Sequence, residues 1–93
     1  MPYIDGHKRA MIETPLSMVI AHIIIQEKEK DRVGMVNYTI SAMMNEILKT
    51  DGISYHTING LIGVLECAKL ELYRRVASPY EDEKIQSNGD VFQ

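Results

Sequence analysis

The chain contains no tryptophan, one phenylalanine and a single cysteine among its 93 residues. One cysteine excludes an internal disulfide framework, so a reducing cytoplasm is the expected location. Cys67 has apolar neighbours in a predicted helix, where an inert buried thiol is favoured over a nucleophile. We expect one helical domain, residues 1–93, with a modest core that self-association commonly supplements.

The sequence also lacks a long apolar run and an excess of positive charge. Its most apolar run, residues 18–25, is too short to span a bilayer and contains His22. The N-terminus lacks the apolar stretch of a signal peptide. The net charge of −3 argues against a general DNA-binding protein, which is usually basic. We therefore expect neither a membrane nor DNA as a partner.

Motifs of catalysis and of metal binding are missing as well. The sequence has no phosphate-binding glycine loop, no cysteine pair for zinc and no HExxH. The three histidines, His7, His22 and His56, lie on separate segments. No two carboxylates stand three residues apart, the spacing with which all-α nucleotide pyrophosphatases hold magnesium. The sequence therefore predicts a non-enzymatic protein without a metal or a cofactor.

Proline and glycine divide the chain into predicted helices. Thr14 and Pro15 are typical of a cap followed by a first helical residue, so a helix is expected from Pro15 to about Lys30. A shorter helical segment is expected before it, at about residues 5–12, with Asp5 as its cap. The first main helix would then end in the charged run at residues 27–32, a solvated helix end.

Gly34 is interpreted as a break before a second helix, predicted from about Met35 to Leu48 and followed by a turn at Asp51-Gly52. The third and longest helix is predicted from about Tyr55 to Ala77, with Ser54 as its cap. Its apolar residues recur at spacings of three and four: Ile58, Leu61, Ile62, Leu65, Ala68, Leu72 and Val76.

A second stripe of the third helix runs along Gly60, Gly63, Cys67 and Leu70. Glycine inside a helix costs about 1 kcal/mol relative to alanine, so two of them on one side indicate a closely approaching backbone. That backbone is either the second helix of the same chain or the same helix of a neighbouring copy. We favour the neighbour, because a chain this small gains stability by association.

A short fourth helix is predicted from Pro79 to about Gln86. Ser78 stands at the cap, Pro79 at the first helical position and Glu81 where a capping box needs a carboxylate. Gly89 suits the left-handed conformation that ends a helix. The predicted fold class is therefore all-α, a helical hairpin or small bundle of three main helices plus a short C-terminal one, assembled as a homo-oligomer.

Side chains suited to an anionic, aromatic ligand gather mostly near the end of the third predicted helix. Guanidinium and ammonium groups match phosphate, phenol rings stack on nucleobases, and amides read base or ribose edges. The candidate ligand-binding residues are Lys69, Tyr73, Arg74, Arg75, Tyr80, Asn37 and Asn88.

A purely structural interpretation of these residues competes with the functional one. Arg74 and Arg75 can each pair with Glu71, and both suit the negative end of the helix dipole. Glu66 can pair with Lys69, or with Arg74 of another subunit. The tyrosines can equally be residues at the rim of the core.

Three blocks of residues resemble a family of small proteins from phages, bacteria and archaea to which no activity is attached. The first block comprises Gly34, Asn37, Tyr38 and Ile40, and the second comprises ten positions between Ile58 and Arg75. The third is a C-terminal signature, PYEDxKIxxNGDV, at residues 79–91. Phe92 stands where the family would have a tyrosine. The resemblance implies membership of that family and no mechanism.

The segment KLELYRRVASP, residues 69–79, is similar to the final helix of phage anti-defence sponge proteins of the anti-CBASS and anti-Thoeris kind. This resemblance implies a helical hairpin that assembles and sequesters nucleotides in pockets between subunits. We therefore expect a non-enzymatic, nucleotide-sequestering protein of phage or prokaryotic origin that counteracts a nucleotide-based immune signal. Its ligand would be a cyclic nucleotide or an ADP-ribose derivative. The alternative is a small helical adaptor that docks on a larger protein through Tyr80 to Phe92.

Overall fold

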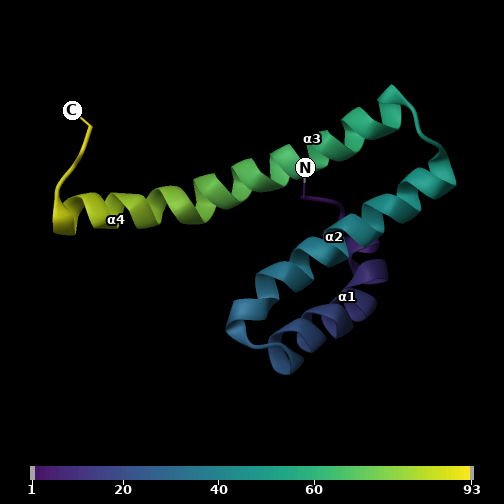
Figure 1. Cartoon of the computed structure of the whole chain (residues 1–93), viewed down its shortest axis with the longest axis horizontal. Helices are drawn as coiled ribbons and strands as arrows, with labels where there is room; N and C mark the ends of the chain where they lie inside the picture. The colour runs from purple at the N-terminus through teal and green to yellow at the C-terminus, as the bar shows by residue number, and fades with distance from the viewer. Residues whose placement is uncertain (1, 93) are drawn as a thin grey trace. The chain divides into compact units, whose positions relative to one another are not determined.

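A computed structural model describes residues 2–92 of the chain. Its elements are α1 (Gly6–Gln26), α2 (Glu29–Asp51), α3 (Tyr55–Leu72), the π-helical turn η1 (Tyr73–Ala77) and α4 (Ser78–Asn88) (Figure 1). No strand occurs among these residues, which confirms the predicted all-α class. The chain divides into two parts, residues 2–58 and residues 59–92. Over residues 2–92, no helix is long and apolar enough to cross a membrane.

Helix α1 is a single helix where two were predicted. It begins after Asp5, whose carboxylate accepts a hydrogen bond from the Lys8 backbone N–H at 2.9 Å, as expected of a cap. Pro15 lies inside α1, so the predicted helix start at Thr14 and Pro15 was wrong. A proline removes one backbone donor. Helix already formed on both sides of it continues across the gap, because extending a helix is far easier than starting one.

Helix α2 begins at Glu29, inside the charged run that was predicted to end the first helix. Gly34 lies within α2, so the break predicted there was also wrong. Two carboxylates in the first turn of α2 interact favourably with the positive end of its dipole and move its start upstream. Helix α2 ends at Asp51, and Gly52 has a φ of +88°, which confirms the predicted turn.

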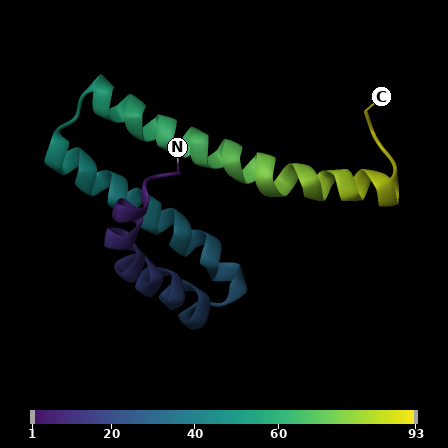
Figure 2. The ribbon, with the colours of Figure 1, turned by 180° about the vertical axis from the view of Figure 1, so that it is seen from behind.

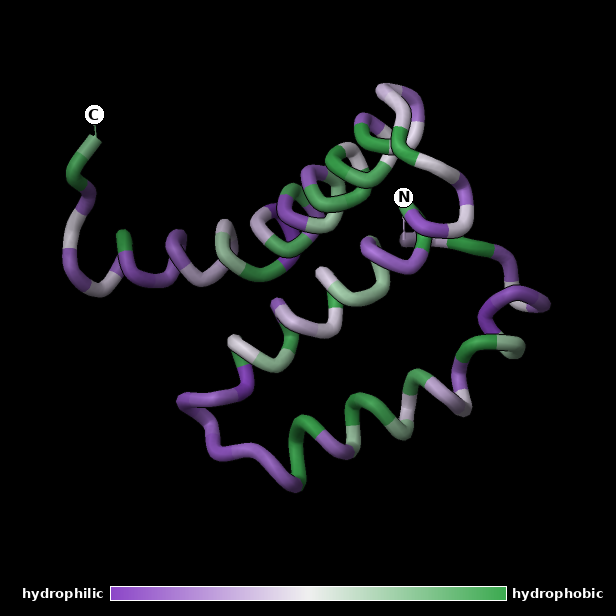
Figure 3. Tube along the Cα trace, turned by 45° about the vertical axis from the view of Figure 1, so that its right-hand side comes forward, coloured by the Kyte–Doolittle hydropathy of each residue, from purple (hydrophilic) through white to green (hydrophobic). Residues whose placement is uncertain are grey.

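Helices α1 and α2 pack against each other as a hairpin joined by a short polar connection (Figures 1 and 3). Ile23 of α1 is the only buried side chain among residues 2–92. Arg32 of α2 ties the hairpin together, because its Nη2 donates to the Ile24 carbonyl at 3.0 Å. That carbonyl belongs to the last turn of α1, where the helix itself supplies no donor.

Helix α3 begins as predicted, since the Ser54 hydroxyl accepts a hydrogen bond from the Thr57 backbone N–H at 3.2 Å. Helices α3 and α4 and the turn η1 follow one another without a break, as Figure 2 shows from behind. Hydrophobic segments recur along α3, whereas α4 is mostly hydrophilic (Figure 3). Helix α4 extends to Asn88, and Gly89 has the predicted positive φ, here +91°.

The predicted stop before Pro79 is replaced by a continuous helix with a wider turn. Ser78 has helical dihedral angles, and its backbone N–H donates to the Tyr73 carbonyl, five residues back. Pro79 has no N–H, and in a regular α-helix its ring would clash with the carbonyl of Arg75. The π turn relieves that clash by adding one residue to the turn. Ser78 therefore makes no cap hydrogen bond, and the predicted capping box with Glu81 does not form.

The absence of a cap at Ser78 gives a testable prediction. Replacing a serine cap by alanine costs about 1 kcal/mol, whereas Ser78→Ala is expected to change the free energy of unfolding by less than about 0.5 kcal/mol. Pro79→Ala is expected to stabilise the protein by about 1–3 kcal/mol, because the new amide can donate to the Arg75 carbonyl. Urea unfolding followed by circular dichroism measures both. A loss of about 1 kcal/mol in Ser78→Ala would mean that Ser78 is a cap after all.

Candidate functional site

Six of the seven candidate residues lie along one continuous helix. Lys69 lies in the last turn of α3. The start of η1 is formed by Tyr73, Arg74 and Arg75, and α4 carries Tyr80 and Asn88. Asn37 lies on α2, in the other part of the chain.

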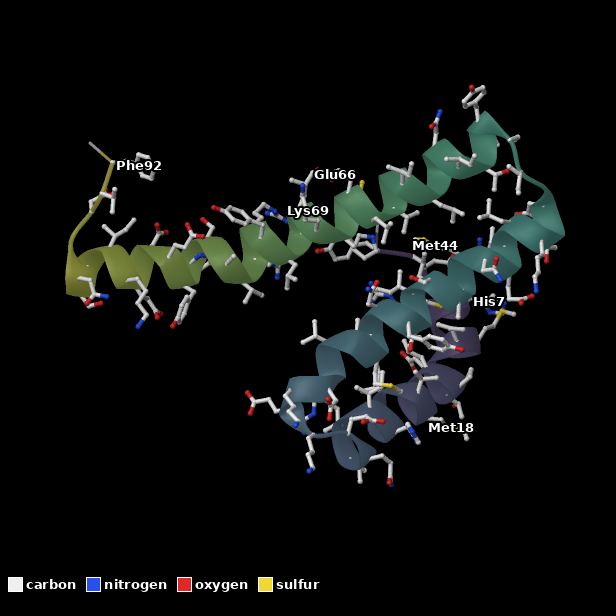
Figure 4. The ribbon with its side chains drawn as sticks, in the orientation of Figure 1. His7, Met18, Met44, Glu66, Lys69 and Phe92 are labelled. Atoms are coloured by element: carbon white, nitrogen blue, oxygen red, sulfur yellow. The ribbon has the colours of Figure 1, made fainter. Side chains whose placement is uncertain are left out.

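Two of the three candidate cations already have carboxylate partners three residues earlier. The Lys69 ammonium lies 3.0 Å from a Glu66 oxygen, and Figure 4 shows the two side chains next to each other on α3. The Arg74 Nη2 lies 3.2 and 3.3 Å from the two carboxylate oxygens of Glu71. These pairs are the ones that the structural interpretation of the sequence predicted. Each is a surface pair of a kind that contributes about 0–1 kcal/mol, so a stronger anion can displace it.

Arg75 differs from the other two cations. It is exposed, and it makes no side-chain hydrogen bond or ion pair with any residue between 2 and 92. The pairing with Glu71 that its spacing allowed is absent within these residues, because the Glu71 carboxylate turns to Arg74. All the N–H donors of the Arg75 guanidinium are therefore available to bind an anion.

A hydrogen bond links the π turn to α4. The Tyr73 hydroxyl donates to the Glu81 Oε2 at 3.3 Å. Residues eight apart lie about 80° apart around a regular α-helix, whereas residues seven apart lie within about 20°. The extra residue of the π turn brings Tyr73 and Glu81 onto one side of the helix. The Glu81 charge, the hydrogen bond to it and slight desolvation raise the pKa of Tyr73 above 10.0.

Tyr80 has a cation close to its ring. The Lys84 ammonium lies 5.3 Å from the ring centroid, within the range of a cation–π contact. Lys84 was not among the candidate residues, although its position four residues after a helical tyrosine could have indicated it. The contact places the Lys84 ammonium over one face of the phenol ring.

Two hollows open to solvent accompany these side chains, one in each part of the chain. One, of about 280 Å³, lies between α4 and the tail and is lined by Lys84, Ile85, Asn88, Val91 and Phe92 among others. The other, of about 270 Å³, lies between α1 and α2 and is lined by Met18, Val19, His22, Ile23, Met35 and Thr39. The second was missed, since only an irregular methionine pattern pointed to it. No group of three metal-ligating side chains exists within residues 2–92.

This geometry defines an all-helical protein whose candidate polar side chains lie exposed along one long helix. The chain belongs to the family described as a domain of unknown function (DUF6899), whose model matches residues 1–91. No curated protein and no solved structure matched in the corresponding searches. The family match covers nearly the whole chain and carries no activity with it.

The contact between Tyr73 and Glu81 predicts a pH effect. Glu81→Gln removes the charge that repels the tyrosinate, so the pKa of Tyr73 is expected to fall toward 10.0. Because the pKa is raised in the folded state, the contact stabilises the protein below pH 10 and is lost as the pH rises through that raised pKa. Tyrosine ring resonances measured by NMR from pH 8 to 12, assigned with Tyr73→Phe, report the pKa. Glu83→Gln is the control, and an equal shift in both variants would refute the pairing.

Proposed function

We propose that this protein is a non-enzymatic binder that sequesters a small nucleotide, as expected of a phage or prokaryotic protein that counteracts a nucleotide signal. The observation that supports this most is the π turn, which holds Tyr73, Arg74 and Arg75 in consecutive exposed positions. Single π turns inside α-helices occur frequently at functional sites. Tyr80 follows in the first turn of α4. Side chains that can donate hydrogen bonds to a phosphate and rings that can stack on a base thus lie within about two turns of helix.

The electrostatics of the turn suit a phosphate group. Arg75 makes no side-chain hydrogen bond or ion pair among residues 2–92. Lys69 pairs with the exposed Glu66, and the exposed Arg74 pairs with the half-buried Glu71. A phosphate carries more charge than one carboxylate and accepts two parallel bonds from a guanidinium. Exchanging Glu71 for phosphate at Arg74 therefore costs little and gains a stronger contact.

The two tyrosines suit a base. Tyr73 and Tyr80 expose 52% and 57% of their surface, enough for one ring face each. Stacking of a base on an aromatic side chain is worth about 1–3 kcal/mol. Lys84 beneath the Tyr80 ring adds a positive charge within reach of a phosphate on the same ligand. A nucleotide satisfies both kinds of group at once, whereas inorganic phosphate satisfies one.

Charge reversal at Arg75 tests the proposal. Native mass spectrometry and calorimetry with cyclic di- and trinucleotides and ADP-ribose derivatives are expected to identify a ligand that the wild type binds. Arg75→Glu should weaken that binding by roughly 10- to 100-fold, the usual consequence of losing an arginine–phosphate contact. The helical circular dichroism should stay unchanged, because Arg75 makes no side-chain hydrogen bond or ion pair within residues 2–92.

Lys49→Glu is the matched control for this experiment. Lys49 is an exposed cation paired with Glu46 on α2, so the variant changes the net charge equally at a distant sequence position. The proposal is abandoned if no nucleotide of the panel binds, or if both variants weaken binding to the same degree.

A second function, docking on a larger protein, is supported by the C-terminal tail. Val91 and Phe92 expose 85% and 84% of their surface beside the hollow that Ile85 and Lys84 line. Two adjacent apolar side chains with this exposure resemble the anchors through which short segments bind a partner. The Phe92 backbone N–H donates to the Asp90 carboxylate at 3.0 Å, which gives the tail a defined local conformation.

The docking function predicts that the tail alone is required. The double variant Val91→Asp, Phe92→Asp should lose a partner that the wild type binds with purified components at a fixed ratio, while nucleotide binding persists. Co-purification followed by reconstitution and calorimetry measures this. Asp82→Asn on α4, an exposed change outside the hollow, is the control. Equal binding by wild type and double variant would contradict docking through the tail.

A further inference from the structure

Helix α3 is apolar on two opposite sides. One side carries five residues at alternating spacings of three and four, which we call the α3 seam: Ile58, Leu61, Leu65, Ala68 and Leu72. The other side, about half a turn around the helix, carries Leu70 and Cys67 beside the small Gly60 and Gly63. A surface helix of a globular protein has one apolar side, so α3 needs cover on both.

Neither side is covered within residues 59–92. This part of the chain is one continuous run of helix followed by a tail, so it contains no second helix to pack against α3. Leu65 and Leu72 of the α3 seam expose 43% and 64% of their surface, and Leu70 on the other side exposes 54%. The apolar surface of α3 therefore requires packing partners from beyond this part.

We propose that the α3 seam pairs with the α3 seam of a second copy of this chain. Residues 2–92 contain a single helical hairpin, α1 and α2, and one hairpin can cover one side of α3 at most. The alternating three–four spacing is that of helices that pair along their length, knobs into holes. The α3 seam spans two heptads and contains no charged residue, as such a contact requires.

The pairing is antiparallel and centred on Leu65. In this register Ile58 of one copy faces Leu72 of the other, and the bulky Leu61 lies next to the small Ala68. Large side chains then oppose small ones, which allows close packing. The opposite choice, parallel and in register, would set Leu61 beside Leu61 and Ala68 beside Ala68.

Charge selects the same orientation. Three consecutive carboxylates, Glu81, Asp82 and Glu83, begin α4 on the continuation of the same helix. Parallel pairing would bring the two acidic segments side by side, whereas antiparallel pairing about Leu65 moves them to opposite ends, about 50 Å apart. The helix dipoles also oppose each other favourably in the antiparallel pair.

This inference goes beyond the proposed function and is independent of it. The α3 seam contains none of the candidate ligand residues, and the test needs no nucleotide. Sedimentation equilibrium of the wild type is expected to give about twice the chain mass of 10.6 kDa, or a multiple of that pair. Leu65→Glu should raise the dissociation constant at least about 100-fold, because two carboxylates would face each other at the centre of the pair.

Gln86→Glu, on exposed α4, adds the same charge away from the α3 seam and should leave the mass unchanged. Circular dichroism separates loss of pairing from loss of fold. A monomeric wild type, or equal effects of the two variants, would overturn the proposal.

Cross-linking tests the orientation directly. In a Cys67→Ala background, Leu65→Cys should form a disulfide between two copies under mild oxidation, and Leu72→Cys should not. A mixture of Leu72→Cys and Ile58→Cys chains should cross-link to each other. Self-cross-linking of both Leu65→Cys and Leu72→Cys would establish a parallel pair and refute the antiparallel one. No cross-link in any sample would refute the pairing of the α3 seam altogether.

Discussion

The stability of this protein depends on how much of the apolar surface of its helices is buried by other parts of the structure. Backbone hydrogen bonds are satisfied inside each helix, yet Ile23 alone is buried among residues 2–92. Burial of apolar surface is the largest favourable term in folding, so helices with this much exposed apolar surface gain most of their stability from packing. Packing of α1 against α2 in the hairpin buries only a small part of this apolar surface. The second copy that we infer on the α3 seam would bury a larger part of it.

A second constraint, the missing amide of Pro79, decides the local geometry of the candidate site. It converts an expected helix boundary into a π turn, so that α3 and α4 run on as one helix with one extra residue between them. That residue brings Tyr73 and Glu81 onto one side of the helix, where they form a hydrogen bond. The proposed ligand contacts and the raised pKa of Tyr73 thus share one cause.

Several elements were predictable because their signals are local. Asp5 and Ser54 cap helices as their residue types indicate, and Gly52 and Gly89 take the positive φ that ends a helix. The ion pairs of Lys69 and Arg74 follow from a three-residue spacing on a helix. These features depend on a few neighbouring residues, so the sequence contains all that determines them.

The wrong predictions of helix boundaries all concern a proline or a glycine that lies inside a helix. Pro15, Gly34 and Pro79 are individually unfavourable in a helix, and each was interpreted as a boundary. Whether a helix continues through such a residue depends on the stability of the helix on either side, a property of many residues at once. No local motif around Pro79 distinguishes a stop from a π turn.

The sequence by itself determined the helical class, the caps and the positions of the charged and aromatic side chains, because these follow from residue type and helical spacing. Only the three-dimensional structure decided that Arg75 makes no side-chain hydrogen bond or ion pair within residues 2–92, and that the long helix passes Pro79. Those outcomes depend on side-chain reach and on the rotation per residue around the helix. A single added residue in one turn changes that rotation for everything beyond it.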